Sequence, residues 1–284
     1  MNDRPVHPAS LPRDIETLLH RARRRDVLWL LGAASLYPLI GCGSEAGEPG
    51  SGSDGGSSAS SGSDGGTDGG TGNGSCSSIP EETAGPYPGD GSNGPNALAL
   101  SGIVRSDIRT TLGDPSSVAT GVPVTITLTL VNPASSCAPI VGAAVYLWHC
   151  DALGRYSLYS SGVTGESWLR GVQATDTSGK VQFATIFPGC YPGRWPHVHF
   201  EIYPSLAAAS SSANKRATSQ LALPQPTCAA VYATTGYTGS TANLANVSLA
   251  TDTVFSDGAT LETPSVTGDV SSGYQATLTV GVVP

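Results

Sequence analysis

Two stretches of the chain alternate strictly between apolar and polar residues, and this period of two constrains the fold most strongly. From Val122 to Leu130 every second residue is Val, Ile or Leu, and the intervening residues are Pro or Thr. From Tyr274 to Val282 apolar residues again occupy every second position. Side chains on a strand point alternately to its two faces, so both stretches are predicted to be half-buried strands.

Three shorter runs, residues 143–148, 180–186 and 197–203, are rich in β-branched or aromatic residues and are bounded by turn-forming residues. Only residues 206–220 have a composition that favours a helix. With 36 Gly, 21 Pro and 13% charged residues, the chain is not expected to be rich in helix. The pattern predicts an all-β fold, an antiparallel β-sandwich with long loops.

The first 42 residues have the features of a bacterial export signal. Three arginines at 23–25 precede an apolar run over residues 27–40, which is too short to span a membrane. The arginines resemble a twin-arginine signal, and Leu39-Ile-Gly-Cys42 resembles a lipobox whose cysteine becomes lipidated. An amphipathic helix with a chance cysteine is the alternative. We expect export to the cell envelope, with membrane attachment only through a lipid at Cys42.

Residues 43–75 contain 13 Gly and 9 Ser and no aromatic residue, which predicts a disordered tether. The folded domain is therefore expected at 76–284. Six of the 14 basic residues precede residue 26, and the net charge is −8, so a nucleic-acid partner is not expected. The domain has five cysteines, and an exported protein can hold up to two disulfides among them, with pairing left open.

A candidate metal site lies in the predicted strand at 197–203. His197 and His199 are one residue apart, so their imidazoles point to the same face and can reach one metal ion. The alternative is that no metal binds and that the two histidines are surface residues or pack across neighbouring strands. Tyr191 lies six residues upstream, in a loop rich in Pro and Gly.

Four blocks of sequence in the centre of the domain share one pattern of order and spacing. They read WHCDALGRYS at 148–157, LRGVQATD at 169–176, TIFPGCY at 185–191 and RWPHVHF at 194–200. Together they resemble the intradiol ring-cleavage dioxygenases. Weaker agreement extends to residues 81–87, 105–108 and 218–220.

The resemblance implies a mononuclear, non-haem Fe(III) held by Tyr156, Tyr191, His197 and His199. Fe(III) is a hard cation that favours anionic oxygen donors, and coordination lowers the pKa of a phenol. By resemblance, Tyr191 and His199 are axial ligands, and a catechol displaces Tyr191, which then acts as a base. The implied reaction inserts O2 into a catechol-type ring between the two hydroxylated carbons and yields a muconate-type diacid.

Two further catalytic residues follow from the resemblance. Arg194 matches an arginine that stabilises negative charge on the bound ring, a role suited to a permanently charged guanidinium. Gln220 matches an active-site glutamine, although the intervening segment is longer than usual. The implied partners are a small aromatic vicinal diol and O2, and the sequence predicts no oligomeric state.

Two other functions remain open at this point. His197, His199 and Glu201 alternate on one strand and could form a two-histidine, one-carboxylate metal site for Fe(II) or Zn(II) chemistry. Alternatively, the domain could be a lipid-anchored, non-catalytic β-sandwich that binds polysaccharide or another protein, because fold alone does not imply catalysis.

Overall fold

A computed structural model describes residues 76–284. The predicted export signal, Cys42 and the tether at 43–75 lie outside the described residues. None of the helices within 76–284 is long and apolar enough to cross a membrane.

The described elements are predominantly strands, as predicted. The strands are β1 (Thr110–Thr111), β2 (Asp114–Val118), β3 (Pro123–Asn132), β4 (Ala138–Pro139), β5 (Ala144–Trp148), β6 (Arg170–Ala174), β7 (Lys180–Ile186), β8 (His197–Tyr203), β9 (Ala217–Ala222), β10 (Ser265–Asp269) and β11 (Gly273–Gly281). The helices are α2 (Gln225–Tyr232) and α3 (Ser240–Ala245), with single 3-10 turns η1 (Ala97–Ala99), η2 (Pro133–Ser135), η3 (Ser212–Asn214), η4 (Leu249–Thr251) and η5 (Phe255–Asp257).

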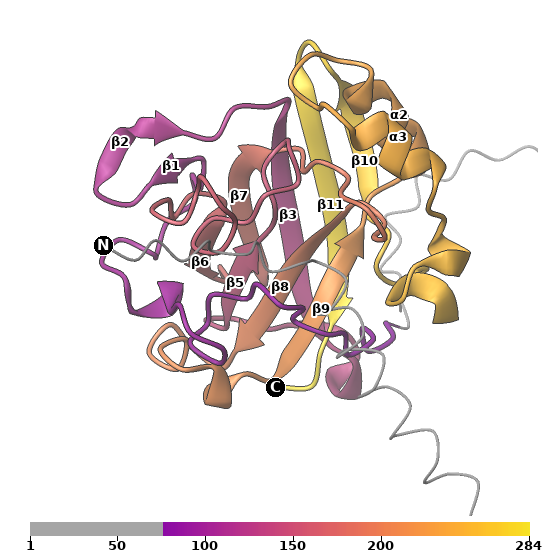
Figure 1. Cartoon of the computed structure of the whole chain (residues 1–284). Helices are drawn as coiled ribbons and strands as arrows, with labels where there is room; N and C mark the ends of the chain where they lie inside the picture. Colours follow the sequence, from indigo (N-terminus) through magenta and orange to yellow (C-terminus); the bar gives the residue numbers. More distant parts are fainter. Residues whose placement is uncertain (1–75) are drawn as a thin grey trace, which may run out of the picture. The chain divides into compact units, whose positions relative to one another are not determined.

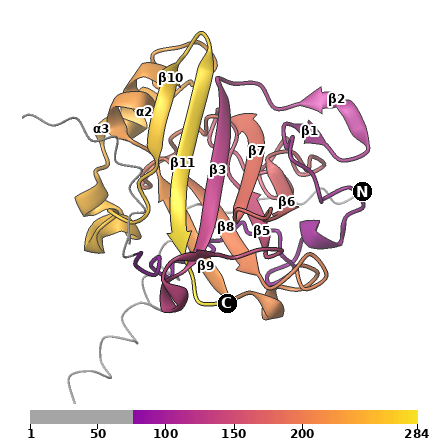
Figure 2. The same cartoon turned by 180° about the vertical axis from the view of Figure 1, so that it is seen from behind.

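Two sheets pack face to face and confirm the β-sandwich. One sheet has the order β10-β11-β3, with β7 and β4 both pairing with the other edge of β3. The second has the order β6-β5-β8-β9. Figure 1 looks onto the second sheet and Figure 2, seen from behind, looks onto β3 and β11. A separate small ribbon pairs β1 with β2.

The main hydrophobic core lies between these sheets. Ile126 and Leu128 of β3 face Leu147 of β5 and Phe200 of β8, and all four side chains are at most 1% exposed. Because Val198, Phe200 and Ile202 belong to this core, the alternate residues of β8 point to the opposite face of the second sheet. His197, His199 and Glu201 therefore share that outer face, and they are buried there as well.

Two expectations about the elements are wrong. β11 pairs with β3 in parallel, from Tyr274 opposite Val124 to Gly281 opposite Val131, so the sandwich is not wholly antiparallel. A long crossover between the two strands makes a parallel pairing possible. Residues 206–220, predicted to be the only segment able to form a helix, form a turn region followed by β9, because pairing with the free edge of β8 overrides local helix propensity, and the helices α2 and α3 lie after this segment.

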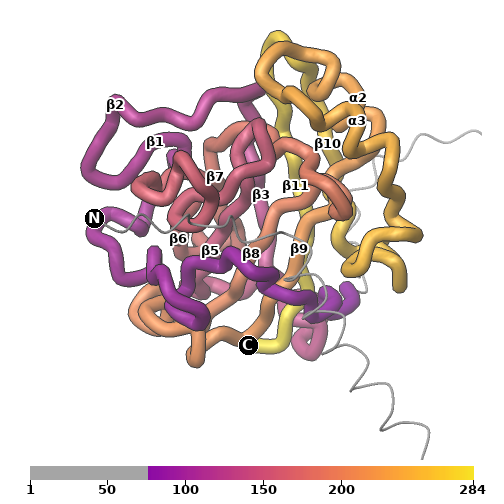
Figure 3. The backbone as a smooth tube through the Cα atoms, in the orientation of Figure 1, coloured from indigo at the N-terminus to yellow at the C-terminus, as the bar shows by residue number. Residues whose placement is uncertain are grey.

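An N-terminal strap, residues 76–90, covers the outer face of the second sheet. Its amide at Glu82 donates to Thr218 O at 2.7 Å, and Pro88 O accepts from the Tyr146 hydroxyl at 2.8 Å. Figure 3 shows the strap as the indigo trace that passes in front of β8 and β9. This strap and the loops beside it form a second buried cluster with Tyr146, Trp148 and Tyr156.

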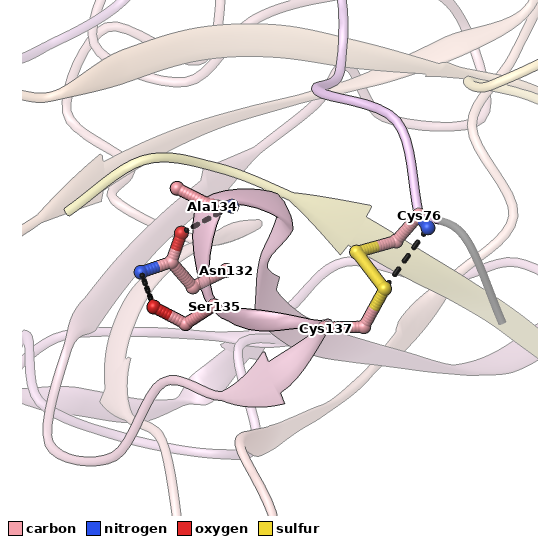
Figure 4. The surroundings of a disulfide bond; sticks show 5 residues. All are labelled: Cys76, Asn132, Ala134, Ser135 and Cys137. Atoms are coloured by element: carbon pink, nitrogen blue, oxygen red, sulfur yellow. Dashed lines mark hydrogen bonds between the residues drawn. A yellow bond between two sulfur atoms is a disulfide. The ribbon is translucent and has the colours of Figure 1, made fainter. Parts of the chain in front are cut away.

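One disulfide, Cys76–Cys137, joins the start of the strap to the turn between β3 and β4 (Figure 4). The other three described cysteines, Cys150, Cys190 and Cys228, are buried thiols. The sequence left room for two bridges, and the structure forms one. The bridge closes a loop with a sequence separation of 61 residues.

Breaking this bridge should lower the free energy of unfolding by about 4 kcal/mol, because the unfolded chain regains the entropy of a long loop. The measurement is urea unfolding of the full chain with and without dithiothreitol. The double variant Cys76→Ser/Cys137→Ser is the control, since added reductant should not destabilise it further. An unfolding midpoint that is the same for oxidised and reduced chains would contradict the prediction.

Candidate active site

Four side chains from three segments meet on the outer face of the second sheet. Tyr156 lies in the loop between β5 and β6, and Tyr191 lies in the loop between β7 and β8. His197 and His199 project from β8 itself. The four residues named as metal ligands in the sequence analysis are therefore brought together.

The polar atoms of these side chains converge on one point. The Tyr156 hydroxyl lies 3.4 Å from the Tyr191 hydroxyl and 3.3 and 3.2 Å from the Nε2 atoms of His197 and His199. His197 Nε2 is 3.1 Å from both the Tyr191 hydroxyl and His199 Nε2. We call this arrangement the four-donor site. Donors this close together can bind a single cation that replaces their contacts with one another.

Neighbouring groups fix the orientation of both imidazoles. His197 Nδ1 lies 2.5 Å from the Trp195 carbonyl, so Nδ1 carries the proton and Nε2 presents a lone pair to the site. The His199 ring stacks on Trp148 at 4.9 Å with an interplanar angle of 2°. Gly85 of the strap lies against the His199 ring, where an added Cβ would come within 3.4 Å of Cε1.

The two loops that carry the tyrosines pack tightly against each other. Gly154 has a φ of +79°, and a Cβ there would lie 2.9 Å from Tyr191 Cβ, so glycine is required at the contact. Asp151 accepts hydrogen bonds from the amides of Leu153 and Arg155, both at 2.9 Å. These contacts hold the turn that leads into Tyr156 and fix its distance from Tyr191.

Burial dominates the electrostatics of the four-donor site. Tyr156, His197 and His199 are at most 3% exposed, whereas Tyr191 is partly exposed. Burial, reinforced by neighbouring Tyr191, raises the pKa of Tyr156 well above its usual range, and burial also raises the pKa of Tyr191. Burial lowers the pKa of His197 and of His199 well below 6.5, with Arg194 adding to both shifts. Without a cation the site therefore holds four neutral side chains.

Arg194 and Gln220 contact each other beside the four-donor site. Gln220 lies on β9 directly opposite His199 in the pairing with β8. Its side-chain oxygen accepts from an Arg194 terminal nitrogen at 2.8 Å, and its amide nitrogen donates to Thr83 O of the strap at 2.8 Å. The structure thus brings Arg194 and Gln220 together on the side of β8 that carries the two histidines, despite the longer segment between β8 and β9.

Glu201 does not complete a metal site with the two histidines. One carboxylate oxygen accepts from Lys215 at 3.0 Å and the other accepts from the Tyr203 hydroxyl at 2.6 Å. Within residues 76–284 no group of three His, Cys, Asp or Glu side chains could hold a metal ion. The remaining histidine of this region, His149, contacts Thr185 Oγ1 and Cys150 O, which agrees with a structural role.

Two charged residues that support the site, Arg170 and Asp252, were not predicted from the sequence. Asp252 is fully buried and binds Arg194 across 58 positions of sequence, so no local motif signals it. Arg170, also fully buried, donates to Tyr87 O and Pro88 O of the strap and to both oxygens of Ser157, next to Tyr156. The sequence did offer one signal for Arg170, because it lies in the block at 169–176 that resembles the dioxygenases.

Replacing Arg170 by Met should lower the free energy of unfolding by about 3 kcal/mol, because buried carbonyls of the strap lose a charged donor. The measurement is urea unfolding of the full chain. Arg155→Gln is the matched control, since its ion pair with Asp151 is 40% exposed on the arginine side and should contribute less than about 1 kcal/mol. Equal losses in the two variants would contradict the role assigned to Arg170.

Comparisons with known proteins agree with this geometry. A family model described as "Dioxygenase" matches residues 94–226, which include all four donors together with Arg194 and Gln220. The solved structure of an intradiol ring-cleavage dioxygenase from Tetranychus urticae is 26% identical, with a TM-score of 0.57, over 74% of this chain and 96% of that chain. A second solved dioxygenase is 27% identical, with a TM-score of 0.58, over 74% of this chain and 95% of that chain. No curated protein sequence matches the chain.

The matched region, the shared fold and the four converging donors agree on one class of enzyme. The alternative of a non-catalytic β-sandwich that only binds a partner is therefore not supported. Over residues 94–226 the chain matches the dioxygenase family model, and its fold is similar to that of solved intradiol ring-cleavage dioxygenases.

Proposed function

We propose that the chain binds one non-haem Fe(III) through Tyr156, Tyr191, His197 and His199 and cleaves catechol-type rings between the hydroxylated carbons. The observation that carries the proposal is the convergence of two phenol oxygens and two imidazole nitrogens, in which the Tyr156 hydroxyl and His197 Nε2 each lie 3.1–3.4 Å from the other three atoms. The donor set suits a ferric ion, because two phenolates offset most of its charge and the imidazoles remain neutral. His197 is already oriented as an acceptor by Trp195.

Bound iron would supply a Lewis acid that holds both oxygens of the aromatic diol and polarises the ring toward O2. The four donors differ in access, since Tyr191 alone among them is partly exposed. We assign Tyr191 to the position at which substrate enters and propose that its phenolate oxygen accepts a proton from a substrate hydroxyl. Tyr156, His197 and His199, all buried, hold their positions throughout.

Arg194 is proposed to stabilise negative charge that develops on the ring. Burial alone lowers the pKa of Arg194, but the neighbouring Tyr191 and Asp252 outweigh it and the net shift is upward. The guanidinium is therefore charged at all working pH values. A fixed charge in a water-poor site stabilises a developing anion more strongly than the same charge in water.

The proposed substrate is a small aromatic vicinal diol, the co-substrate is O2, and the product is a muconate-type diacid. We also propose that the enzyme acts outside the cytoplasm, attached through a lipid at Cys42. The predicted signal at 1–42 supports this location, and the Cys76–Cys137 disulfide is of the kind that persists in oxidising compartments.

The test is turnover of catechol by the full chain loaded with ferric iron, with O2 uptake and product followed together. We expect one O2 consumed per ring opened and a colourless diacid as product. A semialdehyde, formed by cleavage beside the diol, would overturn the proposed position of ring opening. Absence of O2 uptake with catechol and with its alkyl-, halo-, hydroxy- and carboxy-substituted forms would overturn the proposed function itself.

A further inference from the structure

Asp252 is a fully buried carboxylate that contacts Arg194 from the C-terminal part of the chain. One oxygen, Oδ2, accepts from Arg194 Nε at 2.9 Å and from the Trp195 amide at 2.6 Å. The other, Oδ1, accepts from the amides of Val254 and Phe255 at 2.8 and 3.1 Å. Four N–H groups thus hydrogen-bond to the Asp252 carboxylate and hold it in place, so the carboxylate is a rigid partner for the Arg194 guanidinium.

Arg194 is held at two points by this contact and by Gln220. Nε is bound to Asp252, and a terminal nitrogen donates to Gln220 Oε1 at 2.8 Å. The Phe255 ring lies 5.9 Å from the guanidinium carbon. These two hydrogen bonds engage two of the five N–H groups of the guanidinium, which leaves further donors to point toward a bound ligand.

We propose that Asp252 is a positioning residue for Arg194, and that its buried carboxylate sets the orientation of the guanidinium beside the four-donor site. This inference rests on the proposed function of Arg194. An arginine held only by Gln220 could rotate about its long side chain, and charge stabilisation in an active site depends on a fixed orientation. Asp252 lies beyond the residues 94–226 that match the family model.

A purely structural role must be separated from this one. Asp252 also binds three backbone amides, so its loss could disturb the turn at η5 without any effect through Arg194. A structural effect would lower stability and act independently of Arg194. A positioning effect would disappear once Arg194 itself is removed, and a double-mutant cycle distinguishes the two.

The experiment compares Asp252→Asn, Arg194→Gln and the double variant in the full chain loaded with ferric iron. Asp252→Asn should lower kcat at least tenfold at unchanged iron content, and it should cause no further loss in the Arg194→Gln background. Asp257→Asn, the matched control, removes a nearby exposed carboxylate that, in the described part of the chain, makes no hydrogen bond or ion pair with Arg194, and its kcat should remain within twofold of wild type. Wild-type kcat in Asp252→Asn, or losses that multiply in the double variant, would overturn the inference.

A second readout needs neither turnover nor a variant. In NMR spectra of the metal-free wild-type chain, the Arg194 Nε proton should exchange with water far more slowly than that of Arg109, whose ion pair with Asp107 is 41% exposed on the arginine side. Equal exchange rates would overturn the inference. A wild-type chain that shows this protection but, once loaded with ferric iron, cleaves neither catechol nor its substituted forms would instead overturn the proposed function and leave the Arg194–Asp252 contact established.

Discussion

Replacing Tyr156 by Phe should abolish ring cleavage, with a loss of at least about 10³-fold in turnover, because the site loses one of its two anionic donors and several kcal/mol of metal binding. Tyr156 contacts all three other donors and is 2% exposed. Because this position is buried, a water molecule could take the place of the missing phenolate only if the loop rearranged. We therefore expect Tyr156→Phe to lose iron as well as activity.

Tyr191→Phe should separate these two effects. Tyr191 is partly exposed, so water or hydroxide can take its place, and the variant should retain part of its iron while losing turnover to a similar extent. The measurements are metal content and O2 uptake on the same samples. Tyr274→Phe is the control, since this tyrosine lies in β11 of the other sheet. Iron content and turnover that are unchanged in both ligand variants would contradict the four-donor site.

Arg194→Gln should lower kcat by about 10²-fold to 10³-fold, which is the usual effect of removing one group that stabilises developing charge. The iron content should not change, because Arg194 is not one of the four donors. Arg194→Lys should recover only part of the loss, since an ammonium lacks the planar donors that contact Asp252 and Gln220 together. Steady-state O2 uptake and metal analysis measure both quantities.

A different pattern would give Arg194 a different role. If Arg194→Gln raised KM alone and left kcat unchanged, the guanidinium would contribute only to uniform binding of the substrate. If the variant lost iron, Arg194 would act through the structure of the loop that carries Tyr191. Full recovery by Arg194→Lys would show that charge without orientation is sufficient, which would also weaken the case for Asp252.

The strands and the histidines of the site were predictable because their signals are local. The alternation at 122–130 and the His-x-His spacing both follow from the period of two along a single strand, and β3 and β8 bear out the expected strands. The placement of Tyr156 and Tyr191 beside the histidines depended on the family resemblance. No periodicity brings together two loops that are 35 residues apart.

The features that sequence could not supply are contacts between distant segments. The parallel pairing of β11 with β3 depends on where the C-terminal strand finds a free edge, and local pattern does not encode that choice. The contact of Asp252 with Arg194 and that of Arg170 with the strap are similarly long-range. The helix α2 did have a local signal, since Pro226 lies in its first turn, where proline is favoured.

The most direct test of the central claim is the visible absorption spectrum of the purified full chain, with metal analysis, before and after anaerobic addition of catechol. Two tyrosinates on Fe(III) predict a red-brown charge-transfer band that moves to longer wavelength when catechol binds, with one iron per chain. A protein that stays colourless after ferric reconstitution, or that holds zinc in its place, would contradict the assignment of Tyr156, Tyr191, His197 and His199 as ferric ligands.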